Sequence, residues 1–133
     1  MHKYEIEYLD ALYPTVTPDN FNELQYIIMY YSDHFTENSL NWIDVSGFTE
    51  MRNLFSFAKY TGDISKWDVS NVTNMEMMFN YSLFNNDISR WDVSHVTDMT
   101  NMFALSHFNS AISDWDVSHV TSMYGMFNDS QFN

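Results

Sequence analysis

Apolar residues recur along the last two thirds of the chain at a fixed interval of 24 residues. The columns in register include Trp67, Trp91 and Trp115; Val69, Val93 and Val117; Met75, Met99 and Met123; and Phe79, Phe103 and Phe127. A fixed period in the low twenties is typical of solenoids, in which each coil contacts only its neighbours. The pattern therefore predicts a repeat protein with a core of stacked Trp, Val, Met and Phe columns.

The repeat divides the chain into an N-terminal segment, 1–42, and a repeat region, 43–133, which we expect to form one folded domain. The units are 43–66, 67–90, 91–114 and a shortened 115–133. Each complete unit follows the pattern W-D-V-S-x-V-T-x-M-x-x-M-F-x-x-S-x-F-N-x-D-I-S-x, with Ile43 at the Trp position of the first unit.

Each unit is predicted to contain one short helix and one short strand. Val72, Met75, Met78 and Phe79 are spaced by three and one, which fits two turns of α- or 3₁₀-helix. A strand is expected near 87–93, pairing in parallel with its neighbours at ~4.8 Å. The expected fold class is an α/β repeat solenoid.

Two helices are predicted before the repeats. Apolar residues in 3–13 are spaced as in a short amphipathic helix that Pro14 ends. A second helix is expected over 18–32, with Thr17 as N-cap and Pro18 at its first position. Its apolar stripe is expected to cover the open face of the first coil and so cap the stack.

The W-D-V-S-x-V-T-x-M-x-x-M-F core, with F-N-x-D-I-S before the next Trp, resembles the BspA-like leucine-rich-repeat surface proteins, including the mycoplasma-type lipoprotein repeat. The resemblance covers 43–133. It implies a leucine-rich-repeat-like solenoid that functions in binding, often at a bacterial cell surface, and it brings no catalytic residues with it.

Acidic residues outnumber Lys and Arg by 18 to 5, which gives a formal net charge of −13. This charge disfavours direct binding to nucleic-acid phosphates and favours a protein partner with a basic surface. The acidic residues of 91–133, where no Lys or Arg occurs, are the predicted partner-binding surface: Asp92, Asp98, Asp114, Asp116 and Asp129.

The Asp column (Asp44, Asp68, Asp92, Asp116) allows three interpretations. Stacked carboxylates repel by roughly 3 kcal/mol per pair at ~5 Å and an effective dielectric constant near 20. The favoured interpretation is an Asx turn, in which each Asp accepts a backbone N–H two or three residues ahead. A Ca²⁺-binding row and an acidic recognition stripe are the alternatives.

Histidines occupy one turn column, at positions 95 and 119. A transition-metal or pH-sensing role is conceivable for such a pair. Gly47 and Asn71 fill the same column, however, so we interpret it as an exposed turn and predict no metal site.

Nothing in the sequence predicts catalysis or a cofactor. Cysteine is absent, only three glycines occur, and no nucleophile elbow, metalloprotease motif or phosphate-binding loop is present. No signal pattern or membrane-length apolar run is found, so a cytoplasmic location in a bacterial host is expected, or a surface one if a signal or anchor was removed.

Two functions fit these features. The first is an intracellular, phage-like inhibitor that mimics nucleic acid and occupies the basic groove of a nucleic-acid-binding or defence complex. The alternative is a bacterial surface or adhesion module.

The C-terminal end of the stack is a second predicted contact surface. Its expected residues are Trp115, Val117, Val120, Met123, Met126, Phe127 and Phe132. No further coil follows in this sequence, so we expect a homodimer that joins two such ends about a two-fold axis, or coverage by the partner's basic groove. Alternatively, the last residues fold back over the end.

Overall fold

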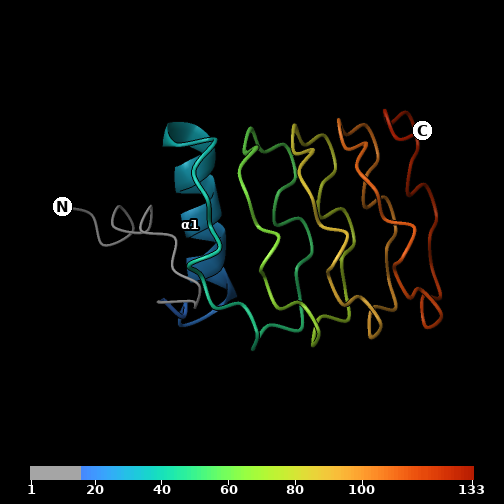
Figure 1. Ribbon diagram of the computed structural model, residues 1–133, viewed down its shortest axis with the longest axis horizontal. Coiled ribbons are helices and arrows are strands. Elements are labelled where there is room, and N and C mark those ends of the chain that lie inside the picture. The colour runs from blue at the N-terminus through green and yellow to red at the C-terminus, as the bar shows by residue number, and fades with distance from the viewer. Residues whose placement is uncertain (1–15) are drawn as a thin grey trace.

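The computed structural model describes residues 16–133, which form one helix beside a row of stacked 24-residue repeats (Figure 1). The helix, α1, spans Phe21–His34. Before it, Val16 forms a single-residue parallel bridge with Ile43. The first predicted helix, in 3–13, lies outside the described residues.

The helix α1 begins three residues later than the sequence predicted and ends two residues later. Asn20, rather than Thr17, is the N-cap: its backbone is extended (φ −161°, ψ 175°), and its side chain accepts the N–H of Glu23 at 2.9 Å. Thr17 instead donates its hydroxyl to Asp44 at 3.4 Å. The predicted bounds of 18–32 were therefore wrong at both ends, because a better cap follows Pro18.

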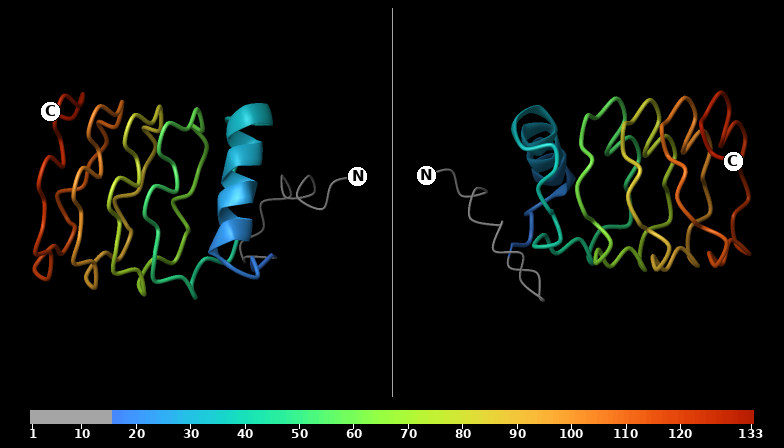
Figure 2. Two further views of the ribbon diagram at one scale, coloured as in Figure 1. Left: turned by 180° about the vertical axis from the view of Figure 1, so that it is seen from behind. Right: turned by 45° about the horizontal axis from the view of Figure 1, so that its top comes forward.

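One face of α1 packs against the start of the repeats. Leu24, Ile27 and Tyr31 are fully buried in the same apolar cluster as the repeat residues. The ring of Tyr31 lies 5.9 Å from that of Trp42, which is also buried. Figures 1 and 2 show α1 alongside the first repeat, where a further repeat would otherwise lie.

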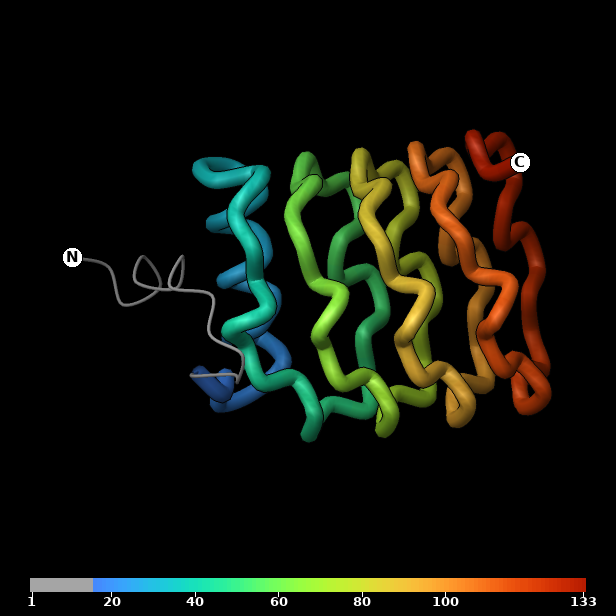
Figure 3. Tube along the Cα trace, in the orientation of Figure 1, coloured from blue at the N-terminus to red at the C-terminus, as the bar shows by residue number. Residues whose placement is uncertain are grey.

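Each repeat is a flattened loop with two long sides and a turn at each end (Figure 3). At one end, the Val-Ser-x-Val segments form tight turns in which the N–H of Val72 bonds the carbonyl of Val69 at 3.0 Å, and Val96 bonds Val93 likewise. We call these the Val-Ser turns. The segments around 57–60, 81–84 and 105–108 turn at the opposite end.

The predicted α/β repeat solenoid, with a helix and a strand in each coil, is wrong. Within 16–133, α1 is the only helix, and no strand is longer than a single-residue bridge. The segment near 87–93 is not a strand. The parallel bridges lie elsewhere in the repeat and link Glu50, Asn74, Asp98 and Ser122 in succession.

A chain of linked turns occupies the segment that was predicted to be helical. Met78 bonds back to the carbonyl of Met75 at 3.2 Å, while the N–H groups of Met77 and Phe79 point to the next repeat and bond Thr100 and Met102 at 2.9 Å. The φ angle of Met77 is +56°, which no right-handed helix accommodates. Alternate N–H groups therefore donate to carbonyls of the neighbouring repeat, so they are not available for hydrogen bonds within a helix.

The core consists of the predicted columns. The rings of Phe55, Phe79, Phe103 and Phe127 stack in sequence with centroids 5.3, 5.5 and 5.6 Å apart and nearly parallel planes. Beside them, Trp91 donates its indole N–H to the carbonyl of Ile64, 27 residues earlier in the chain, at 3.1 Å. Stacking therefore combines apolar burial with hydrogen bonds that fix the register.

Candidate functional site

The acidic turn column (Asp44, Asp68, Asp92 and Asp116) begins the Val-Ser turns. In each case Oδ1 accepts the backbone N–H of the serine two residues ahead at 3.0 Å. The serine hydroxyl also donates to the carboxylate in the first two repeats, at 2.6 Å. The Asx-turn interpretation is therefore confirmed, and it explains why Asp recurs at this position.

Three carboxylates of this column are exposed, at Asp68, Asp92 and Asp116, and Asp44 is half-buried. Hydrogen bonds from the hydroxyl and N–H of Ser94 lower the pKa of Asp92 below its usual value, although the charge of Asp116 opposes this. The same two bonds from Ser118 lower the pKa of Asp116. Asp92 and Asp116 therefore stay ionised and fixed in orientation at neutral pH.

The five predicted acidic residues do not form one surface. Asp92 and Asp116 are neighbours in the acidic turn column, and the exposed Asp114 is two residues from Asp116. Asp98 is half-buried on a long side, where it accepts the N–H of Thr100 at 2.9 Å. Asp129 is exposed, lies 24 residues after Leu105 and shares its positive φ angle, at 52°.

The histidine column links neighbouring repeats. Nδ1 of His95 lies 3.0 Å from the carbonyl of Ser70, and Nδ1 of His119 lies 2.9 Å from that of Ser94. A carbonyl only accepts, so each Nδ1 carries the proton, and the amide of Asn71 makes the same bond to Ser46 at 2.8 Å. Across residues 16–133, no three His, Asp or Glu side chains are grouped as metal ligands.

Sequence reasoning missed an apolar ridge, formed by Phe57, Tyr81 and Leu105 at the turns opposite the Val-Ser turns. Their side chains are 69%, 48% and 37% exposed. All three have φ near +60°, a conformation that bulky residues rarely adopt, and the first two rings stack at 4.7 Å. The sequence did contain one signal for this ridge. Asp129 fills the same column, and a charged residue there marks the column as exposed to solvent.

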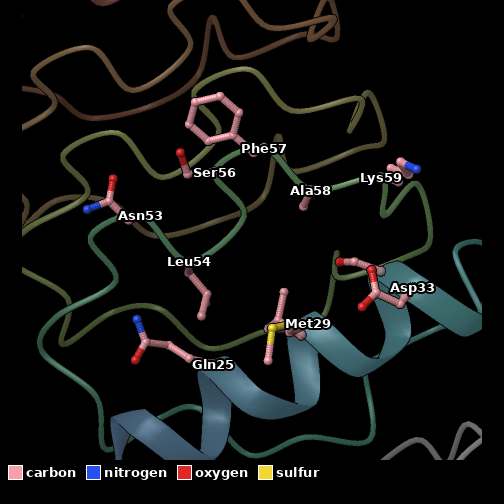
Figure 4. Close-up of a pocket in the computed structure, with 11 residues that line it drawn as sticks. Gln25, Met29, Asp33, Asn53, Leu54, Ser56, Phe57, Ala58 and Lys59 are labelled. Carbon is pink, nitrogen blue, oxygen red and sulfur yellow. The ribbon is translucent and has the colours of Figure 1, made fainter.

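A pocket of ≈ 280 Å³ lies between α1 and the first repeat (Figure 4). Met29 of α1 faces Leu54 of the repeat across it, and Asp33 and Phe57 also line it. Ser32 lines the pocket and is 7% exposed, and its hydroxyl has no hydrogen-bond partner among the described residues. The charged groups of Asp33 and Lys59 also line the pocket.

The predicted C-terminal end face is only partly open. Trp115 and Met126 are buried, at 8% and 6% exposed, because their own repeat and the preceding one cover them. Phe127 and Phe132 are half-buried, and Met123 is 44% exposed. The remaining predicted members of this face, Val117 and Val120, are half-buried.

The last residues continue the repeat and do not fold back over this end. Gln131 donates its N–H to Ser106 at 3.1 Å, and Asn133 donates its N–H to the side chain of Asn109 at 2.9 Å. The alternative in which the terminus covers the end face is therefore wrong for these residues.

Comparison with known families assigns most of the chain. Residues 22–133, which include all the repeats and all of α1 except Phe21, match a family described as "Mycoplasma protein of unknown function, DUF285". The chain belongs to this family. No curated protein and no solved structure matches the DUF285 chain. Among its described residues, no helix combines the length and the apolar character needed to cross a membrane.

Proposed function

We propose that this chain is a non-enzymatic protein-binding module whose acidic turn column binds a partner with a basic surface. The observation that carries the proposal is the set of exposed carboxylates at Asp68, Asp92 and Asp116, each held by its own turn. A carboxylate that is already oriented loses little conformational freedom on binding, so its charge is effective in recognition.

The charge around the column supports the same function. Residues 91–133 contain no Lys or Arg. In the earlier repeats, Arg52 lies 3.9 Å from Glu76 and so faces an acidic group of the chain itself. A negative surface such as that of 91–133 draws a basic partner by long-range attraction and raises the association rate. A protein groove that normally holds nucleic-acid phosphates is such a partner. In its more specific form, the proposal is that the chain is an inhibitor that mimics nucleic acid and occupies this groove.

Asn substitutions test the charge without removing the turns. Replacing Asp68, Asp92 and Asp116 by Asn keeps the Oδ1 acceptor of each Asx turn and removes three charges. Binding to a Lys- and Arg-rich peptide is measured by calorimetry and stopped-flow at about 50 mM and 500 mM salt. We expect affinity to fall steeply with salt and the triple variant to associate roughly tenfold more slowly.

A matched control removes three charges elsewhere. Asp19, Asp33 and Asp129 are exposed and lie outside the acidic turn column. Their Asn variant has the same net charge as the test variant, so equal weakening by both would show that net charge, and not the column, drives binding. Affinity that is insensitive to salt would contradict the proposal altogether.

The second candidate is a surface or adhesion module of BspA-like leucine-rich-repeat type. The family match to 22–133 and the W-D-V-S repeat support it. The two candidates differ in location, which labelling of intact producing cells with a membrane-impermeant amine reagent measures. Labelling of the chain before lysis favours the surface module, and labelling only after lysis favours the internal inhibitor.

A further inference from the structure

The apolar ridge combines exposure to solvent with a strained backbone. Phe57, Tyr81 and Leu105 are exposed, and their φ angles are +61°, +57° and +58°. The other column with positive φ has Asn or Gly at three of its four positions, and these residues tolerate this conformation better than bulky ones do. Burial contributes little for side chains that remain so exposed. The ridge therefore has the properties of a recognition surface and not of a packing surface.

The ridge also lies in turns that lack acidic residues. The segments 57–60, 81–84 and 105–108 contain no Asp or Glu, although the whole chain has 18 of them, and Lys59 and His107 are their only basic residues. The Val-Ser turns at the opposite end of the repeats begin with Asp residues such as Asp68 and Asp92. The two ends of the repeats therefore differ in chemistry, and a partner of the ridge is held by apolar contact and not by charge.

The ridge continues into the pocket beside α1. Phe57 is the first residue of the ridge and also lines this pocket, and Met29, which is 59% exposed, lines it from α1 (Figure 4). The pocket volume of ≈ 280 Å³ lies below the range of about 300–1,000 Å³ that is usual for small-molecule sites. It therefore suits one large side chain of a partner better than a whole ligand.

The backbone and the spacing of the ridge favour a helix as the occupant. The N–H groups of Phe57, Tyr81 and Leu105 already donate to carbonyls of the following repeat, at 2.8, 3.0 and 2.8 Å. An extended segment that binds by strand addition needs such groups, whereas a helix satisfies its own backbone. The rings of Phe57 and Tyr81 are 4.7 Å apart. This spacing is closer to the ~5.4 Å between helix turns than to the ~6.6 Å between alternate residues of a strand.

We propose that the apolar ridge and the pocket beside α1 bind the apolar face of a short amphipathic helix from another protein. The helix lies along the stack and places one large apolar side chain in the pocket beside Phe57. Its next two apolar side chains, four and seven residues further on, contact Tyr81 and Leu105. This site lies at the turns opposite the acidic turn column, so the proposal does not depend on the proposed function.

A second copy of the chain fits the ridge less well. Two ridges would meet through three side chains each, and these are only 37–69% exposed. Such a contact falls far short of the roughly 800 Å² per partner that a stable interface buries. Two chains with a formal net charge of −13 also repel each other. A dimer through the ridge is therefore the competing outcome of the test.

The probe is a set of stapled helical peptides of about 15 residues on an uncharged Ala and Gln scaffold. Three positions spaced i, i+4 and i+7 carry Leu, Met, Phe or Trp in all combinations. A matched set carries the same residues at i, i+2 and i+5, which spreads them around the helix. Binding to the full chain is measured by fluorescence anisotropy. We expect saturable 1:1 binding within the first set only, with affinity that changes by less than about twofold between roughly 50 and 500 mM salt.

Protein variants locate the binding. Phe57→Asp and Tyr81→Asp remove ridge side chains and should still fold, because Asp129 occupies the same column with a φ of +52°. Each should weaken binding at least about tenfold. Tyr124→Asp removes an 80% exposed ring outside the ridge and the pocket, and should bind as the parent does. So should the triple Asn variant of the acidic turn column.

Three results would overturn the proposal. The first is that no peptide of the i, i+4, i+7 set binds. The second is that both ridge variants bind as tightly as the parent. The third is a dimer of the chain in sedimentation that Phe57→Asp dissociates, because a second copy would then occupy the ridge.

Discussion

Replacement of Phe103 by Ala tests the stacked core most directly. The ring is fully buried and has four aromatic neighbours: Phe79 at 5.5 Å, Phe127 at 5.6 Å, Phe108 at 4.4 Å and Trp115 at 6.3 Å. Phe-to-Ala changes in cores cost about 3–5 kcal/mol, and paired rings add about 0.5–1.5 kcal/mol to simple burial. We expect a loss near 4–5 kcal/mol, because rings on both sides prevent the site from collapsing.

Urea denaturation followed by tryptophan fluorescence measures this loss, and a thermal scan should show a melting temperature lower by roughly 10–20 °C. Phe127→Ala is the matched control. Its ring ends the same column, is half-buried, and stacks on Phe103 and Phe132. We expect about half the cost of the first variant. Equal losses for the two variants, or a Phe103→Ala protein that melts within about two degrees of the parent, would refute the stacked column.

Three further predictions address the turns. Hydrogen bonds lower the folded-state pKa of Asp92 and Asp116, so these bonds stabilise the fold above the unfolded pKa of about 4, and this stabilisation is lost as pH falls through the folded pKa. Urea titrations over this pH range should show the loss of stability. The Asp92→Asn variant should show a smaller pH dependence. Ser106→Ala should cost about 1–3 kcal/mol in the same assay, since the buried hydroxyl accepts the N–H of Phe108 at 3.2 Å, and an unchanged midpoint would contradict this role. Phe57→Asn should raise stability by up to about 1 kcal/mol, because Asn tolerates positive φ better than Phe does; a clear loss would mean that the exposed ring stack outweighs the strain.

The helix and the site illustrate how far local sequence reasoning reaches. The apolar stripe of α1 was found, but its start was misplaced because both Thr17 and Asn20 are good caps, and packing decides between them. The Asx turns were anticipated from Asp and Ser two residues apart, since that bond is local. The apolar ridge was not anticipated, because it depends on which groups the neighbouring repeats leave uncovered.

The sequence by itself determined the 24-residue register, and with it which side chains share a column and which columns are buried. Tertiary structure decided the backbone conformation. Residues three apart meet both in a helix and in a chain of linked turns, so the spacing of Met75 and Met78 suits either. Adjacent repeats favour the turns, because they offer carbonyls to alternate N–H groups such as those of Met77 and Phe79, which a helix would keep for itself.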